Sequence, residues 1–390
     1  PHLKKACELN DTQSAMIDFA VYMGYFLIAL PAGWFMNRFG FKKGILLGLF
    51  LYAVGALLFL PAAGSRSYGS FLFALFVIAA GATFLETVAN PYITKLGDPA
   101  TATQRLNFAQ SFNGAGAFIA PIIGGKFILS GIEHSKEKLA DMQASGTLQA
   151  YLQSEADTVK MPYLVIGIGV LVLLAIFAVT KLPEGEDNDA AAAHGHSFSF
   201  SVLKNKQVAM AVMAQFFYIG AQVCVGSFFV RFSSRTMQMP EKDAAFIWGS
   251  VAMVGFMVGR FVGTFLMRSI KPARLLLLFA VLSVLLLVIA MSAEGKLATY
   301  SLVAVPFFMS IMFPTIFALG IDGLGSESRM ASSLLVMSIV GGAILPLVMG
   351  KVSDLTGGNI QIAYIVPTIC FAIVGIFAYN QTKKNVLVQG

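Results

Sequence analysis

One carboxyl group lies deep inside an apolar segment of the chain. Glu86 stands about sixteen residues, or about 24 Å of helix, from the outer end of the apolar run at 70–95. An ionised carboxylate at that depth in a bilayer costs on the order of 2.5–3.5 kcal/mol or more, so it must face a polar cavity or be protonated. Burial favours the neutral acid and can bring protonation into the physiological range. Glu86 is therefore a candidate proton carrier, and a structural glutamate bonded by its neighbours is the alternative.

Amide and phenol groups recur at helical spacing inside the apolar runs. Amides both donate and accept hydrogen bonds, which is what the hydroxyl groups of a neutral sugar require. The same groups can instead bond between helices, a role worth roughly 0.6 kcal/mol a pair. One set falls in the first half of the chain, and the other follows i, i+3, i+7 spacing in the second half. The candidate sugar-binding residues are Asn90, Gln110, Asn113, Gln215, Tyr218 and Gln222.

Charged residues also lie nearer the ends of apolar runs. Asp18, Tyr22 and Tyr25 share a helical face near the outer end of their span. We interpret Asp18 as a hydrated acid without a role in transport, and the alternative is an outer gate. Arg260 lies eight residues before Arg268, about 12 Å further into its span, so its long side chain can reach the aqueous edge or act in gating. The candidate gating residues are Arg38, Lys42, Lys43, Arg260 and Arg268.

These groups are set in a chain that is too apolar to be soluble throughout. Of its 390 residues, 57% are hydrophobic and 12% charged, and the mean hydropathy is +0.76. Soluble domains carry about 25% charged residues. This composition excludes a soluble enzyme, a disordered chain and a disulfide scaffold, and the continuous apolar runs argue against a transmembrane β-barrel.

About eleven apolar runs are long enough to cross a bilayer, where helices are the form that such segments can take. The placement of Lys and Arg predicts that the turn at 37–43 and the C-terminus are cytoplasmic and that Pro1 lies outside. We interpret the net charge of +7 as a matter of topology and anionic lipid, with no nucleic-acid partner. The predicted spans are 15–36, 44–63, 70–95, 104–132, 161–181, 207–231, 244–267, 274–293, 298–321, 329–353 and 361–381.

The two halves of the chain repeat at an offset of about 225–230 residues. The pair Gly33 and Arg38, each at the inner end of a span, recurs as Gly263 and Arg268. The repeat also predicts a partner of the 207–231 span that would precede Pro1, so we expect a first helix missing from this numbering. The predicted domains are a first helical bundle at 1–182, a cytoplasmic linker at 183–206 and a second bundle at 207–390.

Several segments carry a family resemblance. The stretch 33–43 resembles the loop signature of the major facilitator superfamily, with Asn37 where Asp is common. The stretches 84–91, 108–113, 214–222 and 313–317 resemble the family of bacterial L-fucose:proton symporters and glucose/galactose permeases. The resemblance implies twelve helices in two six-helix bundles and monosaccharide uptake driven by an ion gradient. It also implies that Glu86 matches a glutamate important for proton coupling, whose aspartate partner would precede Pro1.

Together these features predict an all-α polytopic membrane protein of the bacterial inner membrane that imports a neutral monosaccharide with protons by alternating access. We expect a monomer in the lipid bilayer, with sugar and a proton or other ion as partners, no cofactor, no metal site and no enzymatic activity. His194 and His196 in the linker lack further ligands, and no phosphate-binding loop is present. The alternatives are a uniporter or carrier of another solute such as an organic anion, and a non-transporting sensor or truncated chain.

Overall fold

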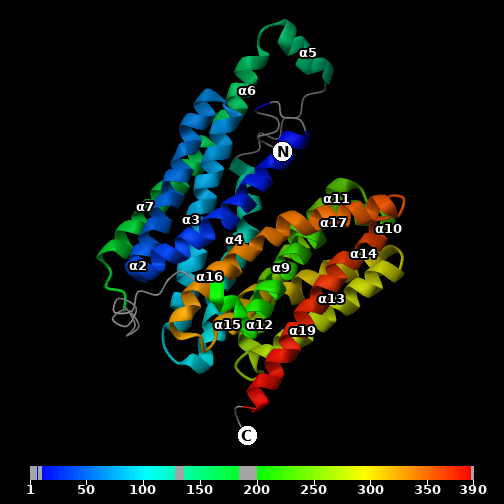
Figure 1. The fold of residues 1–390 in the computed structure, drawn as a ribbon. Helices are drawn as coiled ribbons and strands as arrows, with labels where there is room; N and C mark the ends of the chain where they lie inside the picture. The colour runs from blue at the N-terminus through cyan, green and yellow to red at the C-terminus, as the bar shows by residue number, and fades with distance from the viewer. Residues whose placement is uncertain (1–6, 8–10, 128–135, 184–199, 388–390) are drawn as a thin grey trace. The chain divides into compact units, whose positions relative to one another are not determined.

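The fold is described from a computed structural model that covers all residues except 1–6, 8–10, 128–135, 184–199 and 388–390. Regular structure in the described residues is entirely helical (Figure 1). The chain divides into two compact units. The first comprises Pro1–Val88 with Ala120–Glu184, and the second comprises Ala89–Ile119 with Gly185–Gly390.

The first unit is built on a helix that folds back on itself. Helix α2 (Asp11–Ser65) would be about 80 Å long if straight, more than twice the thickness of a bilayer core. It breaks at Gly40, whose φ of 85° is favourable only for glycine. The segments of α2 before and after Gly40 both pack on α3 (Tyr68–Lys95), at neighbouring positions. A Cβ at Gly24 would contact Ala79, and a Cβ at Gly55 would contact Ile78.

Helix α7 (Lys160–Val179) packs along α2 and completes this unit. The Tyr163 ring stacks on Phe59 with a centroid distance of 3.7 Å, next to the buried Phe71. Helices α5 (Lys136–Ala144) and α6 (Leu148–Asp157) follow one another in this unit, and Gln149 accepts a 2.7 Å hydrogen bond from Arg66.

The second unit packs its helices around α9 (Lys206–Ser227), which contacts several of them and has a row of fully buried residues. The close approach of α17 to α9 depends on Gly341, where a Cβ would overlap the carbonyl of Phe216. Helices α13 and α19 lie side by side (Figure 1). Besides the part of α4 (Ala102–Phe127) up to Ile119, the elements are α10 (Phe229–Met237), α11 (Glu241–Ile247), η3 (Trp248–Ala252), α12 (Met253–Leu266), α13 (Pro272–Ser292), α14 (Gly295–Met309), α15 (Met312–Ile321), α16 (Ser328–Met337), η5 (Ser338–Val340), α17 (Gly341–Leu355), α18 (Ile360–Ala363) and α19 (Ile365–Leu387). Short 3₁₀ turns lie at η1 (Pro99–Thr101), η2 (Phe200–Lys204) and η4 (Gly325–Glu327).

A break between α14 and α15 exposes backbone carbonyls inside the second unit. Pro314 has no N–H to donate to the carbonyl of Ser310, four residues earlier, and the helix is interrupted between Met309 and Met312. The Tyr218 hydroxyl instead donates to the Met309 carbonyl at 2.9 Å, and Arg260 Nε donates to the Ser310 carbonyl at 2.8 Å. The freed acceptors of the broken helix are thus bonded by side chains of α9 and α12.

The predicted all-α membrane fold is confirmed. In the described residues nine helical segments are long and apolar enough to cross a membrane, and the first of them, Phe19–Ser65, contains two predicted spans. The predicted span at 104–132 corresponds to α4, which lies outside those nine and ends at Phe127, and residues 128–132 lie outside the described part of the chain. The proposed domain boundaries at 182 and 207 remain a prediction.

Candidate functional site

Glu86 lies in the first unit, on α3, and is partly buried. Its neighbours in the chain, Thr87 and Val88, are fully buried. Tyr25, on the first arm of α2, is close enough to Glu86 for an electrostatic interaction. The carboxyl group therefore lies beside a phenol inside a helical packing interface, an environment in which the energies of its charged and neutral forms differ from those in water.

Two of the predicted amides are brought together in the second unit. Gln110 Nε2 donates to Asn90 Oδ1 at 3.0 Å, and this bond joins α4 to the end of α3. Asn90 is 5% exposed, whereas Gln110 is partly buried. Asn113, one turn further along α4, is exposed.

The polar stripe of α9 divides into three different environments. Gln215 is fully buried, and neither polar atom of its amide has a hydrogen-bond partner among the described residues. Tyr218 is also fully buried, and its hydroxyl is bonded to Met309. Gln222 is partly exposed and lines a cavity. The helical spacing predicted from sequence is therefore present, but its members make different contacts.

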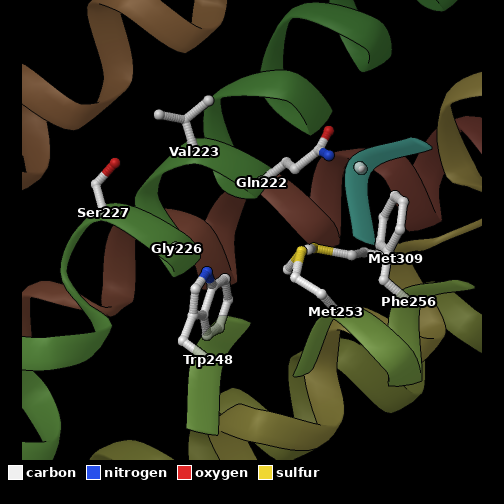
Figure 2. Close-up of a pocket in the computed structure, with 9 residues that line it drawn as sticks. Gln222, Val223, Gly226, Ser227, Trp248, Met253, Phe256 and Met309 are labelled. Atoms are coloured by element: carbon white, nitrogen blue, oxygen red, sulfur yellow. The ribbon is translucent and has the colours of Figure 1, made fainter. Parts of the chain in front are cut away.

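That cavity lies within the second unit and has a volume of about 350 Å³. Its wall comes from α9, from the η3–α12 segment, from the end of α14 and from α4 (Figure 2). Gln222 and Ser227 supply its polar side chains, together with the indole N–H of Trp248. The lining residues are Ala117, Gln222, Val223, Gly226, Ser227, Trp248, Met253, Phe256 and Met309, none of which is charged.

Arg260 does not extend to the aqueous edge. It is 5% exposed, and besides Ser310 it donates from Nη1 to the carbonyl of Gln110. Its guanidinium carbon lies 4.7 Å from the centroid of the Phe256 ring. Two side chains of α4 make further bonds to the same helices. Asn107 Nδ2 donates to Thr315 Oγ1 at 3.1 Å, and Gln104 Nε2 donates to the carbonyl of Thr264 at 3.2 Å. These bonds fasten α4 to α12 and α15.

The other predicted gating residues lie at helix ends. Lys42 donates from Nζ to the carbonyls of Ala178 and Thr180, both at 2.9 Å, and so caps the C-terminus of α7. Arg38 and Lys43 are exposed and lie over the Phe39 ring at 5.6 and 5.9 Å. Arg268 is exposed, with its guanidinium 5.2 Å from the ring centroid of Phe265. A gating role for these residues stays a prediction.

Sequence reasoning missed the apolar part of the cavity. Trp248, Met253, Phe256 and Met309 line it, yet in so apolar a chain nothing distinguishes them from residues that face lipid. The one available signal was rarity, because the chain has only 2 Trp. In the part of the chain that the structure describes, no group of three or more His, Cys, Asp and Glu residues could hold a metal ion.

Helical spans, two compact units and a cavity lined by uncharged residues define a multi-pass α-helical membrane protein. The chain belongs to the Major Facilitator Superfamily, whose family profile matches residues 1–334. It is 39% identical to the glucose/galactose transporter of Brucella abortus biovar 1 (strain 9-941) over 390 residues, covering 98% of this chain and 89% of that protein. It is 40% identical to the L-fucose-proton symporter of Escherichia coli (strain K12) over 392 residues, covering 99% and 89%. Its structure is similar to the crystal structure of the transporter FucP in the outward conformation, with a TM-score of 0.89, 39% identity and coverage of 98% and 92%.

Proposed function

We propose that this chain is a secondary active transporter that imports a neutral monosaccharide of the fucose, glucose or galactose type together with protons. The observation that carries the proposal is an acid, Glu86, within a membrane-spanning helix of a chain whose relatives are a glucose/galactose transporter and an L-fucose-proton symporter. The membrane is the bacterial inner membrane, with the C-terminus in the cytoplasm and the protein acting as a monomer. No cofactor and no enzymatic step are part of the proposal.

The sugar-binding role is assigned to the amides. A sugar hydroxyl both donates and accepts, and the amides of Gln110, Asn113 and Gln222 can do the same. Gln215 supports the assignment, because a buried amide without partners costs about 1–3 kcal/mol for each unsatisfied group. A solute hydroxyl that reached Gln215 would recover that free energy. Asn90 and Tyr218 already make hydrogen bonds within the chain, and the Tyr218 hydroxyl, which donates in its bond, can still accept one from a sugar.

Glu86 is assigned the proton. In the proposed cycle it is protonated from the outside in a state that binds sugar, and it releases the proton inside, which weakens sugar binding. Coupling requires that the proton bind with different affinity in the two states. The surroundings of Glu86 must therefore differ between the state open to the outside and the state open to the inside.

Alternating access is proposed to come from rocking of the bundles at 1–182 and 207–390, joined by the linker at 183–206. The bond of Arg260 to Gln110 joins the two proposed bundles and is of the kind that must break and re-form in such a cycle, whereas its bond to Ser310 lies within the bundle at 207–390. Arg38, Lys42, Lys43 and Arg268 are assigned to the inner ends, where they bias the equilibrium between states.

The experiment is proton-driven uptake and sugar counterflow in proteoliposomes. We expect Glu86→Gln to retain counterflow but to lose accumulation driven by a pH gradient, since an amide does not carry a proton at this pH. Glu241→Gln, at an exposed acid in the first turn of α11, is the matched control and should behave as wild type. Full accumulation by Glu86→Gln would overturn its role in coupling.

The alternatives are separated by the same assay. An organic-anion carrier needs a cation that meets the solute, and the buried cation Arg260 is already bonded to two backbone carbonyls. A sensor would bind sugar without counterflow. A uniporter would show counterflow in wild type but no response to a pH gradient.

A further inference from the structure

The cavity of the second unit has one aromatic wall that the transport proposal does not use. Trp248 is the first residue of η3, a single π-helical turn, and it faces Gly226 of α9 (Figure 2). A Cβ added at Gly226 would lie 3.0 Å from Trp248 Cζ2, 3.5 Å from Cε2 and 3.6 Å from Nε1. The indole thus packs directly on the backbone of α9, at a position that any side chain at 226 would disturb.

The position of the indole is fixed from a second direction. The ring of Phe229, which is fully buried, lies 5.0 Å from the Trp248 ring at an interplanar angle of 34°. Such a tilted pair is a stable aromatic arrangement. Single π turns redirect the side chains that follow them and are frequent at functional sites. Trp248 is therefore a rigid wall of the cavity, and the part of its surface that Phe229 and Gly226 leave uncovered faces the cavity.

The apolar and polar side chains that line the cavity indicate which class of ligand it can bind. Met253, Phe256 and Met309 lie across the cavity from Trp248, and Gln222 extends its amide beside them (Figure 2). A pyranose ring likewise has an apolar part and a polar part. Its axial C–H groups make an apolar face, and its hydroxyl groups form a polar rim. The C–H face suits the negative face of an indole, and the rim suits an amide. No charged side chain lines the cavity, so an ionic solute finds no partner there.

The volume of the cavity also agrees with a single pyranose ring. Small-molecule sites range over about 300–1,000 Å³. At about 350 Å³ this one lies near the lower end of that range, which is enough for a single sugar ring.

We propose that Trp248 is the platform on which the pyranose ring of the transported sugar lies, and that Gly226 is a specificity-determining residue because its missing side chain lets the indole take that position. This inference rests on the proposed sugar transport and adds the residues that recognise the ring. The determinant is the apolar face of the sugar, whereas the amides recognise its hydroxyl groups.

The composition of the chain offers a direct test. Trp34 and Trp248 are its only Trp residues, and Trp34 is 46% exposed on α2. In a Trp34→Phe protein, emission from Trp248 alone reports on the cavity. We expect D-galactose, D-glucose or L-fucose, whichever the protein transports, to shift or quench this emission saturably, whereas a sugar that is not transported leaves the emission unchanged.

Transport kinetics supply the second readout. We expect Trp248→Ala to raise KM about tenfold or more, Trp248→Phe to raise it less, and Gly226→Ala to raise it because the indole must move. Phe246→Ala, two residues before Trp248 and 71% exposed, is the matched control and should leave KM unchanged. If Trp248→Ala does not reach the membrane, Trp248→Phe and Gly226→Ala still provide the KM comparison.

The outcomes separate the two proposals. Uptake that is intact in Trp34→Phe, with no change in Trp248 emission and an unchanged KM in the Trp248 and Gly226 variants, overturns this inference and leaves the transport function standing. A protein that neither takes up any of the three sugars nor responds to them in emission overturns both.

Discussion

Arg260 offers a quantitative test of how the helices of the second unit are held together. Its guanidinium bonds two carbonyls on different helical segments, Ser310 at the α14–α15 break and Gln110 in α4, and lies over the ring of Phe256. Arg260→Lys keeps the charge in the same buried place. A Lys ammonium is a single point on a flexible stem, so it cannot span both acceptors in the way that the planar guanidinium does.

The expected loss follows from these contacts. One charge-assisted hydrogen bond contributes about 1.5–3 kcal/mol, and the cation–π contact with Phe256 contributes about 0.5–2 kcal/mol, part of which an ammonium retains. We therefore expect Arg260→Lys to lose about 2–4 kcal/mol. For a unit of this size 1 kcal/mol corresponds to about 2–4 °C, so the apparent Tm should fall by at least about 4 °C.

The assay is thermal unfolding of the purified protein in detergent, with Arg268→Lys as the matched control. Arg268 lies near the end of the same helical segment but is exposed, and its ring contact with Phe265 is solvated. Replacement of an exposed charge by the same charge should change stability by less than about 0.5 kcal/mol. A Tm for Arg260→Lys no lower than that of Arg268→Lys would refute the reasoning that the guanidinium fork fastens α4 to its neighbours.

Two further predictions follow from single contacts. Tyr218→Phe removes a buried 2.9 Å hydrogen bond to the Met309 carbonyl and should destabilise the protein by about 1–3 kcal/mol. Tyr364→Phe removes a longer 3.3 Å hydrogen bond to the Val225 carbonyl and should destabilise the protein less. The Tm values of the two variants check this order. Burial raises the pKa of the Cys7 thiol, so its thiolate fraction is low at neutral pH and grows as pH rises through that elevated pKa. Maleimide labelling of Cys7 should be slower at pH 7 than labelling of a free thiol in solution and should accelerate through pH 9, and equal rates at pH 7 would contradict this.

Much of the fold was predictable because the bilayer simplifies the sequence signal. Apolar runs of sufficient length specify helices, and basic turns mark their ends. The turn predicted at 37–43 proved to be a break at Gly40, within what would otherwise be one continuous helix. Pro314, which has no N–H, accounts for the freed carbonyl of Ser310 beside the interruption at 310–311, but the sequence does not indicate which side chain bonds it.

The candidate site was predictable only where polarity makes a residue unusual. Helical spacing found Gln110 and Asn90 separately, and their hydrogen bond required knowledge of how α3 and α4 approach each other. Trp248 could not be found in this way, because an aromatic residue in a chain with 57% hydrophobic residues has no distinguishing pattern. Its relation to Gly226 arises from two segments that are distant in the sequence.

The break between α14 and α15 gives two buried polar residues of this chain a structural role. Tyr218 and Arg260 both stand at positions where sequence suggests contact with solute or control of a gate, yet each bonds a carbonyl at the helix break. Because Pro314 removes the donor that would bond the carbonyl of Ser310, that carbonyl would otherwise remain unsatisfied in an apolar interior, at a cost of about 1–3 kcal/mol. Donor capacity already used by the backbone is not available to a sugar. The stronger candidates on α9 are for this reason Gln215, whose amide has no hydrogen-bond partner in the described residues, and Gln222, which lines the cavity.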